Sequence, residues 1–161
     1  LLPGSLTAIA LPVSYAALLG ILALRPLSIP SQTRNELGTS LLDNFVFFRR
    51  EDQMAMHIEI IDELRERYAR CVIVEDKGEV FNSDLVQAIE LGNMIDLAAC
   101  MLQAGIARKA SGGAHARPYD FPTRDDENFM KHSITRWVDD GPELSYKDVR
   151  YTKYDPMERK Y

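Results

Sequence analysis

Residues 83–110 read "SDLVQAIELGNMIDLAACMLQAGIARKA" and carry the longest helical pattern of this chain. Asn82 or Ser83 can accept hydrogen bonds from the first-turn amides, and Arg108 and Lys109 suit the negative C-terminal end. Few polar residues interrupt the segment, so we predict a helix that is buried over much of its circumference. Its apolar and small residues recur at steps of three and four, at Leu85, Ile89, Gly92, Ile95, Ala99, Leu102 and Ile106, and this face is widened by Leu91, Met94, Ala98, Met101 and Gly105.

A second helix is predicted for residues 51–70, "EDQMAMHIEIIDELRERYAR", and the turn-forming connector 71–82 joins it to the first. Glu63 and Arg67 can pair across one turn of its polar face. We expect His57 to lie on this solvated face, without a ligand role. The apolar stripe of this helix consists of Met54, Ile58, Ile61, Leu64 and Tyr68.

A third, short helix is predicted for residues 39–50, "TSLLDNFVFFRR", because its apolar residues leave few positions for solvent. Thr39 or Ser40 would cap its first turn. Just upstream, Pro26 and Pro30 predict a break, since proline cannot supply the amide donors of a helix.

The opening segment differs from the rest, because residues 1–24 carry no charge at all. The segment is long enough to cross a bilayer as a helix, which requires about 20 residues. A signal-like segment and a buried or remnant segment are the open alternatives. The net charge of −5 disfavours a nucleic-acid partner. Cys71 and Cys100 lie in apolar stretches and are expected to be reduced thiols.

The stretch 108–132, "RKASGGAHARPYDFPTRDDENFMKH", is dense in chemically useful residues. His115 and His132 could act as bases, but neither has an assignable nucleophile. The acids have no regular metal-ligand spacing, so we expect them to cap turns and to pair with Arg117, Arg124 and Lys131. We therefore predict no catalytic residue and no metal site in this chain.

The remaining residues complete the expected fold. Residues 133–138 and 144–149 alternate as strands do and are joined by "DDGPE", which predicts a hairpin. Residues 150–161 are charged and aromatic and are expected to be extended. The expected fold class is mainly α, with a small helical bundle followed by a polar loop, a short β-hairpin and an extended C-terminal tail. The loop and the tail together span residues 111–161.

The stretch 80–133, from "VFNSDL" through "ELGNMID" to "RPYDFPTRDDENFMKHS", resembles the C-terminal helical domain of the succinate dehydrogenase/fumarate reductase flavoprotein subunit. Residues 35–50, "NELGTSLLDNFVFFRR", resemble an upstream motif of the same family, and the ending "PMERKY" is similar to actinobacterial members. The resemblance implies three segments: a hydrophobic segment 1–30, a remnant 31–50 of the end of the flavin-binding domain, and the C-terminal domain 51–161.

Full-length members of this family oxidise succinate to fumarate through FAD and pass electrons to an iron–sulfur subunit. The resemblance therefore implies iron–sulfur and membrane-anchor subunits as partners. It also implies a cytoplasmic location, peripheral to the inner face of the cell membrane.

By the same resemblance, Ser40 and Leu41 inherit the flavin-contact positions, at the start of a helix whose amides face the cofactor. Glu36 stands where the family has the arginine that grips a substrate carboxylate, and Ala110 and Gly112 stand where it has Glu and Arg. We therefore expect a truncated or degenerate copy that alone binds no FAD and turns over no substrate.

Two alternatives remain at this point. The chain could be a membrane-tethered, non-catalytic helical interaction module, with residues 1–24 making the membrane contact. It could also be a relative of L-aspartate oxidase, although "RPYDFPTRDDENF" and "ERKY" favour succinate dehydrogenase.

Overall fold

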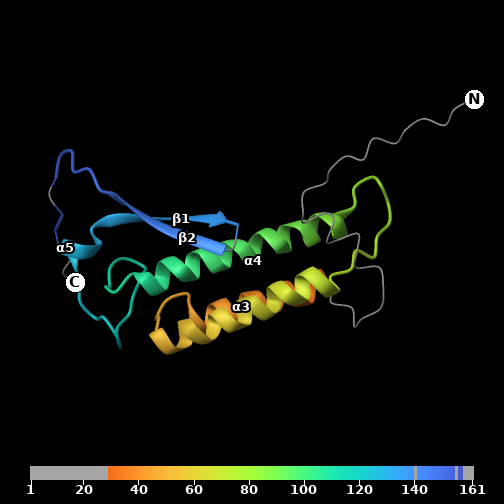
Figure 1. Cartoon of the computed structure of the whole chain (residues 1–161), viewed down its shortest axis with the longest axis horizontal. Coiled ribbons are helices and arrows are strands. Elements are labelled where there is room, and N and C mark those ends of the chain that lie inside the picture. Colours follow the sequence, from red (N-terminus) through yellow and green to blue (C-terminus); the bar gives the residue numbers. More distant parts are fainter. Residues whose placement is uncertain (1–28, 140, 155, 158–161) are drawn as a thin grey trace, which may run out of the picture. The chain divides into compact units, whose positions relative to one another are not determined.

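The computed structural model describes residues 29–139, 141–154 and 156–157, so the predictions made for residues 1–28 lie outside it. Within these described residues, three long helices come first and a two-stranded hairpin follows them (Figure 1). This architecture confirms the mainly α fold class. In chain order the elements are α2 (Pro30–Asn44), α3 (Glu51–Cys71), α4 (Ser83–Ala107), α5 (Asp126–Phe129), β1 (Lys131–Val138) and β2 (Gly141–Asp148).

Helix α2 corrects the prediction of a helix at 39–50. The helix begins at Pro30 and ends at Asn44, so Thr39 and Ser40 lie inside it and cap nothing. Pro30 was expected to break a helix, but a proline in the first turn loses no hydrogen bond, and its fixed φ suits the helix. The aromatic and β-branched run after Asn44 leaves the helix, and Phe48 forms a parallel bridge with Ala116.

Helix α3 confirms the predicted helix within one residue, but its buried face corrects the placement of His57. Met54, His57, Ile61 and Leu64 are all buried, whereas Ile58 is 40% exposed. These four residues are spaced three, four and three positions apart, so they lie on one face of the helix, and His57 is part of that face. His57 is therefore a core residue, and burial lowers the pKa of its imidazole.

Helix α4 ends at Ala107, three residues earlier than predicted. Its buried face is narrower than predicted, because Val86, Leu97 and Met101 are exposed. Among the described residues α4 alone has the length and composition to cross a membrane, a test that core helices of soluble proteins also pass. The buried stripe runs through Ala88, Leu91, Ile95, Ala98, Leu102 and Gly105.

The chain divides into two compact units. Unit 1 comprises residues up to Ser40 together with Glu59–Ile95, and unit 2 comprises Leu41–Ile58 with Asp96–Tyr161. In unit 1, an ion pair joins Arg67 to Glu36, and another joins Arg34 to Glu90 at 3.2 Å. The buried residues of unit 1 are Pro30, Thr33, Leu37, Ile61, Leu64, Val72, Ala88, Leu91 and Ile95.

Unit 2 contains the predicted hairpin. Strands β1 and β2 pair antiparallel, with Lys131 opposite Asp148 and Val138 opposite Gly141. Gly141 has φ 143°, a conformation that side chains disfavour, so glycine suits the turn. The described part of the tail, residues 149–154 and 156–157, contains no helix or strand.

Candidate functional site

Arg117 is the most buried charged residue of unit 2, with a side chain 0% exposed. One guanidinium nitrogen donates to the carbonyls of Ile106 and Arg108, at 3.2 and 3.4 Å. These carbonyls lie at the C-terminal end of α4, where the last turn leaves acceptors without partners and favours a cation. The other terminal nitrogen donates to Glu51 at 2.9 Å and to Asp120 at 3.1 Å.

The same loop also caps helix α3. Asp120 Oδ2 accepts from the Glu51 amide at 2.7 Å, which satisfies a donor of the first turn. Ser111 Oγ accepts from the Arg117 amide at 2.8 Å and donates to the Phe121 carbonyl at 2.6 Å. The loop thus ties the end of α4 to the start of α3 within unit 2. The predicted pairing of loop acids is correct for Arg117 and Arg124, since Asp120 and Asp126 respectively accept from them. The predicted pairing with Lys131 is wrong, since no ion pair of the described residues includes Lys131.

His115 lies between two arginines and orients one of them. Its Nε2 is 3.1 Å from the Arg108 carbonyl, which can only accept, so Nε2 carries the proton. Its Nδ1 faces the Arg49 guanidinium and accepts from it. Burial, and after it the positive charge of Arg49, lower the pKa of His115 to about 4. The ring is therefore neutral at pH 7 and serves as a fixed acceptor for Arg49.

This arrangement predicts a loss of stability in mild acid. The folded pKa of about 4 lies below the ordinary 6.5, so the unfolded state takes up the proton first as the pH falls. Stability is then highest above the ordinary pKa and falls between it and the folded value. We expect His115→Asn to reduce the loss between pH 7.5 and 5 by on the order of 1 kcal/mol, after allowing for solvent screening.

Urea unfolding curves of both proteins at the two pH values measure this difference. Asn at position 115 keeps an acceptor for Arg49 but cannot be protonated, so it isolates the titration from the contact. An unchanged pH dependence in His115→Asn would show that other groups carry the acid sensitivity.

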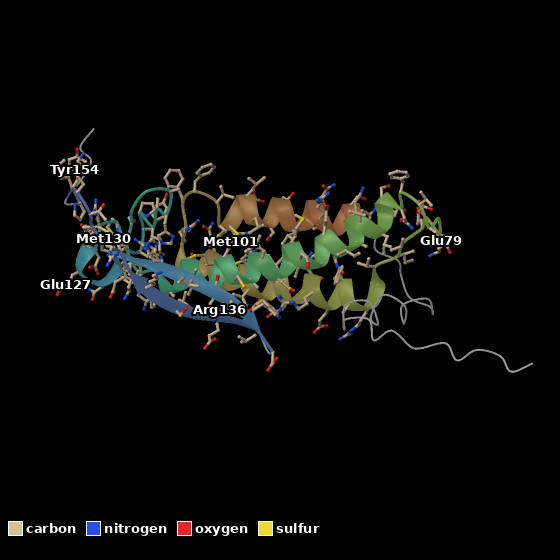
Figure 2. The ribbon with its side chains drawn as sticks, turned by 90° about the horizontal axis from the view of Figure 1, so that it is seen from above. Glu79, Met101, Glu127, Met130, Arg136 and Tyr154 are labelled. Atoms are coloured by element: carbon tan, nitrogen blue, oxygen red, sulfur yellow. The ribbon has the colours of Figure 1, made fainter. Side chains whose placement is uncertain are left out.

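A cavity of about 480 Å³ opens beside this pair, wholly within unit 2. Met101, Ala104 and Gly105 of α4 form part of its wall, and Met101 is labelled in Figure 2. We call this cavity the cationic pocket. Its polar and charged lining residues are Arg49, Arg108, His115, Lys131, His132, Ser133 and Thr135.

The lining of the cationic pocket was not foreseen from the sequence. The Nε of Arg49 donates to the carbonyl of Phe45, which directly follows the end of α2, at 2.7 Å. Arg49 and His115 are far apart in the chain, and the bridge between Phe48 and Ala116 brings them together. No signal in the sequence would have found the pocket, because its lining residues come from segments far apart in the chain.

Ser40 and Leu41, the predicted flavin contacts, lie in the interior of α2. Only the first four amides of a helix lack an internal partner, and these residues lie beyond the first turn that begins at Pro30. Their backbone amides therefore lie within the helix and not at its start, as the predicted contact with FAD had assumed. A contact through the side chains of Ser40 and Leu41 stays a prediction.

Glu36, the residue at the family's substrate-arginine position, is engaged within unit 1. Its carboxylate accepts from Arg67 of α3, and this ion pair requires an acid at position 36. Among the described residues, no group of three or more His, Cys, Asp or Glu side chains is placed to hold a metal ion.

Comparison with known proteins identifies the family. The family described as "Fumarate reductase flavoprotein C-term" matches residues 34–161. The fumarate reductase flavoprotein subunit of Serratia sp. is 40% identical over 133 residues, which are 81% of this chain and 22% of that protein. The mitochondrial succinate dehydrogenase (ubiquinone) flavoprotein subunit of Oryza sativa is 35% identical over 129 residues, or 80% of this chain and 20% of that protein.

Solved structures agree with this result. A FrdA variant of E. coli quinol fumarate reductase matches with a TM-score of 0.79 and 33% identity, over 89% of this chain and 25% of that one. Sdh1 of Mycobacterium smegmatis matches with a TM-score of 0.71 and 26% identity, over 86% of this chain and 24% of that one. The chain spans about a fifth to a quarter of the length of these relatives. It belongs to the fumarate reductase flavoprotein C-terminal family, the family of the succinate dehydrogenase and fumarate reductase flavoprotein subunits.

Proposed function

We propose that this chain serves as the C-terminal domain of a flavoprotein subunit that interconverts succinate and fumarate through FAD. The observation that carries the proposal is the match over residues 34–161, together with the same fold in a quinol fumarate reductase. In this role the chain packs against a flavin-binding domain. The chemistry of the reaction belongs to that domain.

The network around Arg117 supports a structural rather than a catalytic role for the polar loop. Its charged groups are occupied: Arg117 binds two helix-end carbonyls, and Asp120 caps α3. Both terminal nitrogens of Arg117 are engaged and only its Nε has no hydrogen-bond partner, so the side chain lacks the pair of donors that binds a carboxylate bidentately. We propose that the loop holds the ends of α3 and α4 at a fixed separation and so shapes the surface offered to the flavin-binding domain.

Exposed apolar side chains in unit 2 support a packing role. Leu42, Phe47 and Phe48 are 67%, 68% and 69% exposed, and Phe47 and Phe48 are adjacent in the chain. Large apolar side chains gathered at a surface mark contacts with another protein surface. We propose that Leu42, near the end of α2, and Phe47 and Phe48, which follow the helix, are covered by the flavin-binding domain of the subunit.

The further partners we propose are an iron–sulfur subunit and membrane-anchor subunits, at the cytoplasmic side of the membrane. The solved relatives are named as quinol fumarate reductase and as the Sdh1 complex, which supports a multi-subunit assembly. Alone, the chain is expected to bind no FAD and to turn over neither succinate nor fumarate.

A chimera tests the proposal. Residues 51–161 would replace the matching part of the Serratia sp. fumarate reductase flavoprotein subunit, which is 40% identical over the shared region. We expect the chimera to bind FAD in the same proportion as its host and to keep fumarate reduction within about tenfold, a loss of no more than about 1.4 kcal/mol of transition-state stabilisation.

A second chimera, with residues 34–161, brings Glu36 into the host in place of its arginine. We expect this chimera to lose fumarate reduction by on the order of 100-fold or more, because a carboxylate repels the substrate carboxylate that an arginine would bind. Glu36→Arg in that chimera is expected to recover part of the activity. The isolated chain, mixed with FAD, is the control for adventitious flavin.

A further inference from the structure

Three cations, Arg49, Arg108 and Lys131, lie together in the lining of the cationic pocket. Some arginines elsewhere in the described residues are paired with acids, for example Arg34 with Glu90 and Arg124 with Asp126. Arg49, Arg108 and Lys131 make no ion pair with any carboxylate in the part of the chain that the structure describes. No Asp or Glu lines the pocket, although the whole chain carries a net charge of −5.

These three side chains are held in place by aromatic rings rather than by acids. The Arg49 guanidinium lies 4.2 Å from the centre of the Phe45 ring, and its Nε and one terminal nitrogen are fixed by the Phe45 carbonyl and His115. The Lys131 ammonium lies 4.3 Å from the Tyr146 ring centre. Contacts with ring faces orient a cation without neutralising it. Asp125, whose pKa is lowered mainly by hydrogen bonds from Asn128 and to a smaller extent by Lys131, offsets part of the Lys131 charge. Asp125 lies outside the lining, so the pocket stays positive overall.

Strand β1 adds hydroxyl donors to the same pocket. Lys131, Ser133 and Thr135 alternate along the strand, so they share one face of the hairpin, and all three line the pocket. The β1 part of this face is polar between Lys131 and Thr135, whereas the inward face of a hairpin is ordinarily apolar. Ile134, on the opposite face, is the more exposed side chain. The hairpin thus directs its polar face into the pocket.

The negative C-terminal end of helix α4 lies close to the cationic pocket, since Arg108 follows the helix and lines the pocket. The carbonyls of Ile106 and Arg108 already accept from Arg117, and the Arg108 carbonyl also accepts from His115. These donors offset the partial negative charge of the helix end. A neighbouring pocket, which shares Arg108, is different because Asp125 and Asp126 line it. The absence of acids is therefore a property of the cationic pocket and not of the whole loop.

We propose that the cationic pocket binds a small oxyanion that carries several negative charges, as phosphate or carboxylate groups. Arginine donors fit such oxygens bidentately, lysine adds a point charge, and Ser133 and Thr135 can donate through their hydroxyls. The volume of about 480 Å³ is that of a site for a small organic ligand. The proposal does not depend on the proposed function, since the pocket lies wholly in unit 2 and requires neither FAD nor a partner.

Titration calorimetry of the whole chain, with pyrophosphate and in parallel with citrate, tests the proposal. Sodium chloride holds the ionic strength constant, so that screening does not imitate binding. We expect saturable binding of at least one probe. The probe that binds more tightly identifies the chemical class of the ligand. Tighter binding of pyrophosphate indicates a phosphorylated ligand, and tighter binding of citrate indicates a polycarboxylate. Either result supports the proposal.

Variants in the same strand make the test specific. Lys131→Gln is expected to weaken binding about tenfold, as the loss of one charge-assisted hydrogen bond does. The control is Arg136→Gln, which removes an exposed charge outside the pocket lining. We expect this control variant to bind within about twofold of the unchanged protein. Arg136 is labelled in Figure 2. Gly112→Glu places a carboxylate in the lining, where an added Cβ meets nothing within 4 Å, and is expected to abolish binding.

Circular dichroism confirms that each variant is folded, and Arg108→Gln replaces Lys131→Gln if that protein fails to fold. The proposal is overturned if neither probe binds more tightly than chloride. Equal weakening by Lys131→Gln and Arg136→Gln would overturn it as well, because general electrostatics would then explain the binding.

Discussion

Replacing Arg117 with alanine is expected to lower the free energy of unfolding by about 3 kcal/mol, the cost of removing one partner from a buried charged network. The side chain is 0% exposed and makes four hydrogen bonds, two of them to carbonyls that end α4. Alanine leaves those carbonyls without a donor and opens a cavity. Glu51 is partly exposed and can be hydrated again when Arg117 is removed. We therefore expect a cost at the lower end of the range of about 3 to 5 kcal/mol that such changes have.

Two further variants give this prediction its control. Arg117→Lys keeps the charge but replaces the planar fork by a single nitrogen, so it should still cost about 2 kcal/mol. Arg124→Ala breaks an exposed ion pair with Asp126 and should cost less than 1 kcal/mol. Trp137, the single tryptophan, lies in unit 2 and reports its unfolding in urea. If Arg117→Ala and Arg124→Ala were equally stable, Arg117 could not be the centre of the loop.

Gly105→Val is the second substitution with a large expected effect, a loss of about 2 to 3 kcal/mol from overpacking. A Cβ at Gly105 would lie 2.5 Å from Phe45 Cε2 and 3.0 Å from Phe45 Cζ. Phe45 is only 3% exposed, and the Arg49 guanidinium stacks on its ring, so the ring has little freedom to move away. Glycine is required here for close packing, and its intrinsic cost of about 1 kcal/mol in a helix is the smaller effect.

The matched control is Gly112→Val, because an added Cβ at Gly112 meets nothing within 4 Å. We expect that variant to stay within about 0.5 kcal/mol of the parent protein, as ordinary surface substitutions do. Adding Phe45→Leu to Gly105→Val should cost less than the sum of the two single changes, since the smaller side chain relieves the contact. Additive losses would show that Gly105 and Phe45 do not interact.

The long helices were predictable because their periodicity is strong, whereas their buried faces were less so. We predicted Ile58 on the inner face of α3 and His57 on its solvated face, but the structure buries His57. Helical spacing between Met54 and Ile61 fits either residue, so periodicity does not decide between them, and hydrophobicity favours isoleucine. A polar residue in a core is thus a feature that tertiary packing decides.

Boundaries were harder to predict than elements. Pro30 reads as a helix breaker in the sequence, yet in the structure it is the first residue of α2. Whether a proline ends a helix or begins one depends on the residues after it, and α2 continues as a helix of 15 residues. The same shift moved Ser40 and Leu41 from a helix start to a helix interior. The expected flavin contact of these two residues stays a prediction.

The cationic pocket could not have been predicted, because its parts come from separate segments of the chain. Arg49 follows α2, His115 belongs to the loop after α4, and Lys131 begins β1. Each residue has an ordinary local explanation, as a helix-end cation, a loop base or a strand-edge charge. Only the pairing of Phe48 with Ala116 and the packing of the hairpin bring the three into one cavity.

The flavin content and fumarate turnover of the chimera that carries residues 51–161 test the central claim most directly. If the chain is the C-terminal domain of such a flavoprotein, the purified chimera binds FAD in the same ratio as its host. It also reduces fumarate within about tenfold of the host rate, a difference of about 1.4 kcal/mol in the barrier. A folded, soluble chimera that binds no FAD, or that binds FAD and reduces no fumarate, would contradict the claim.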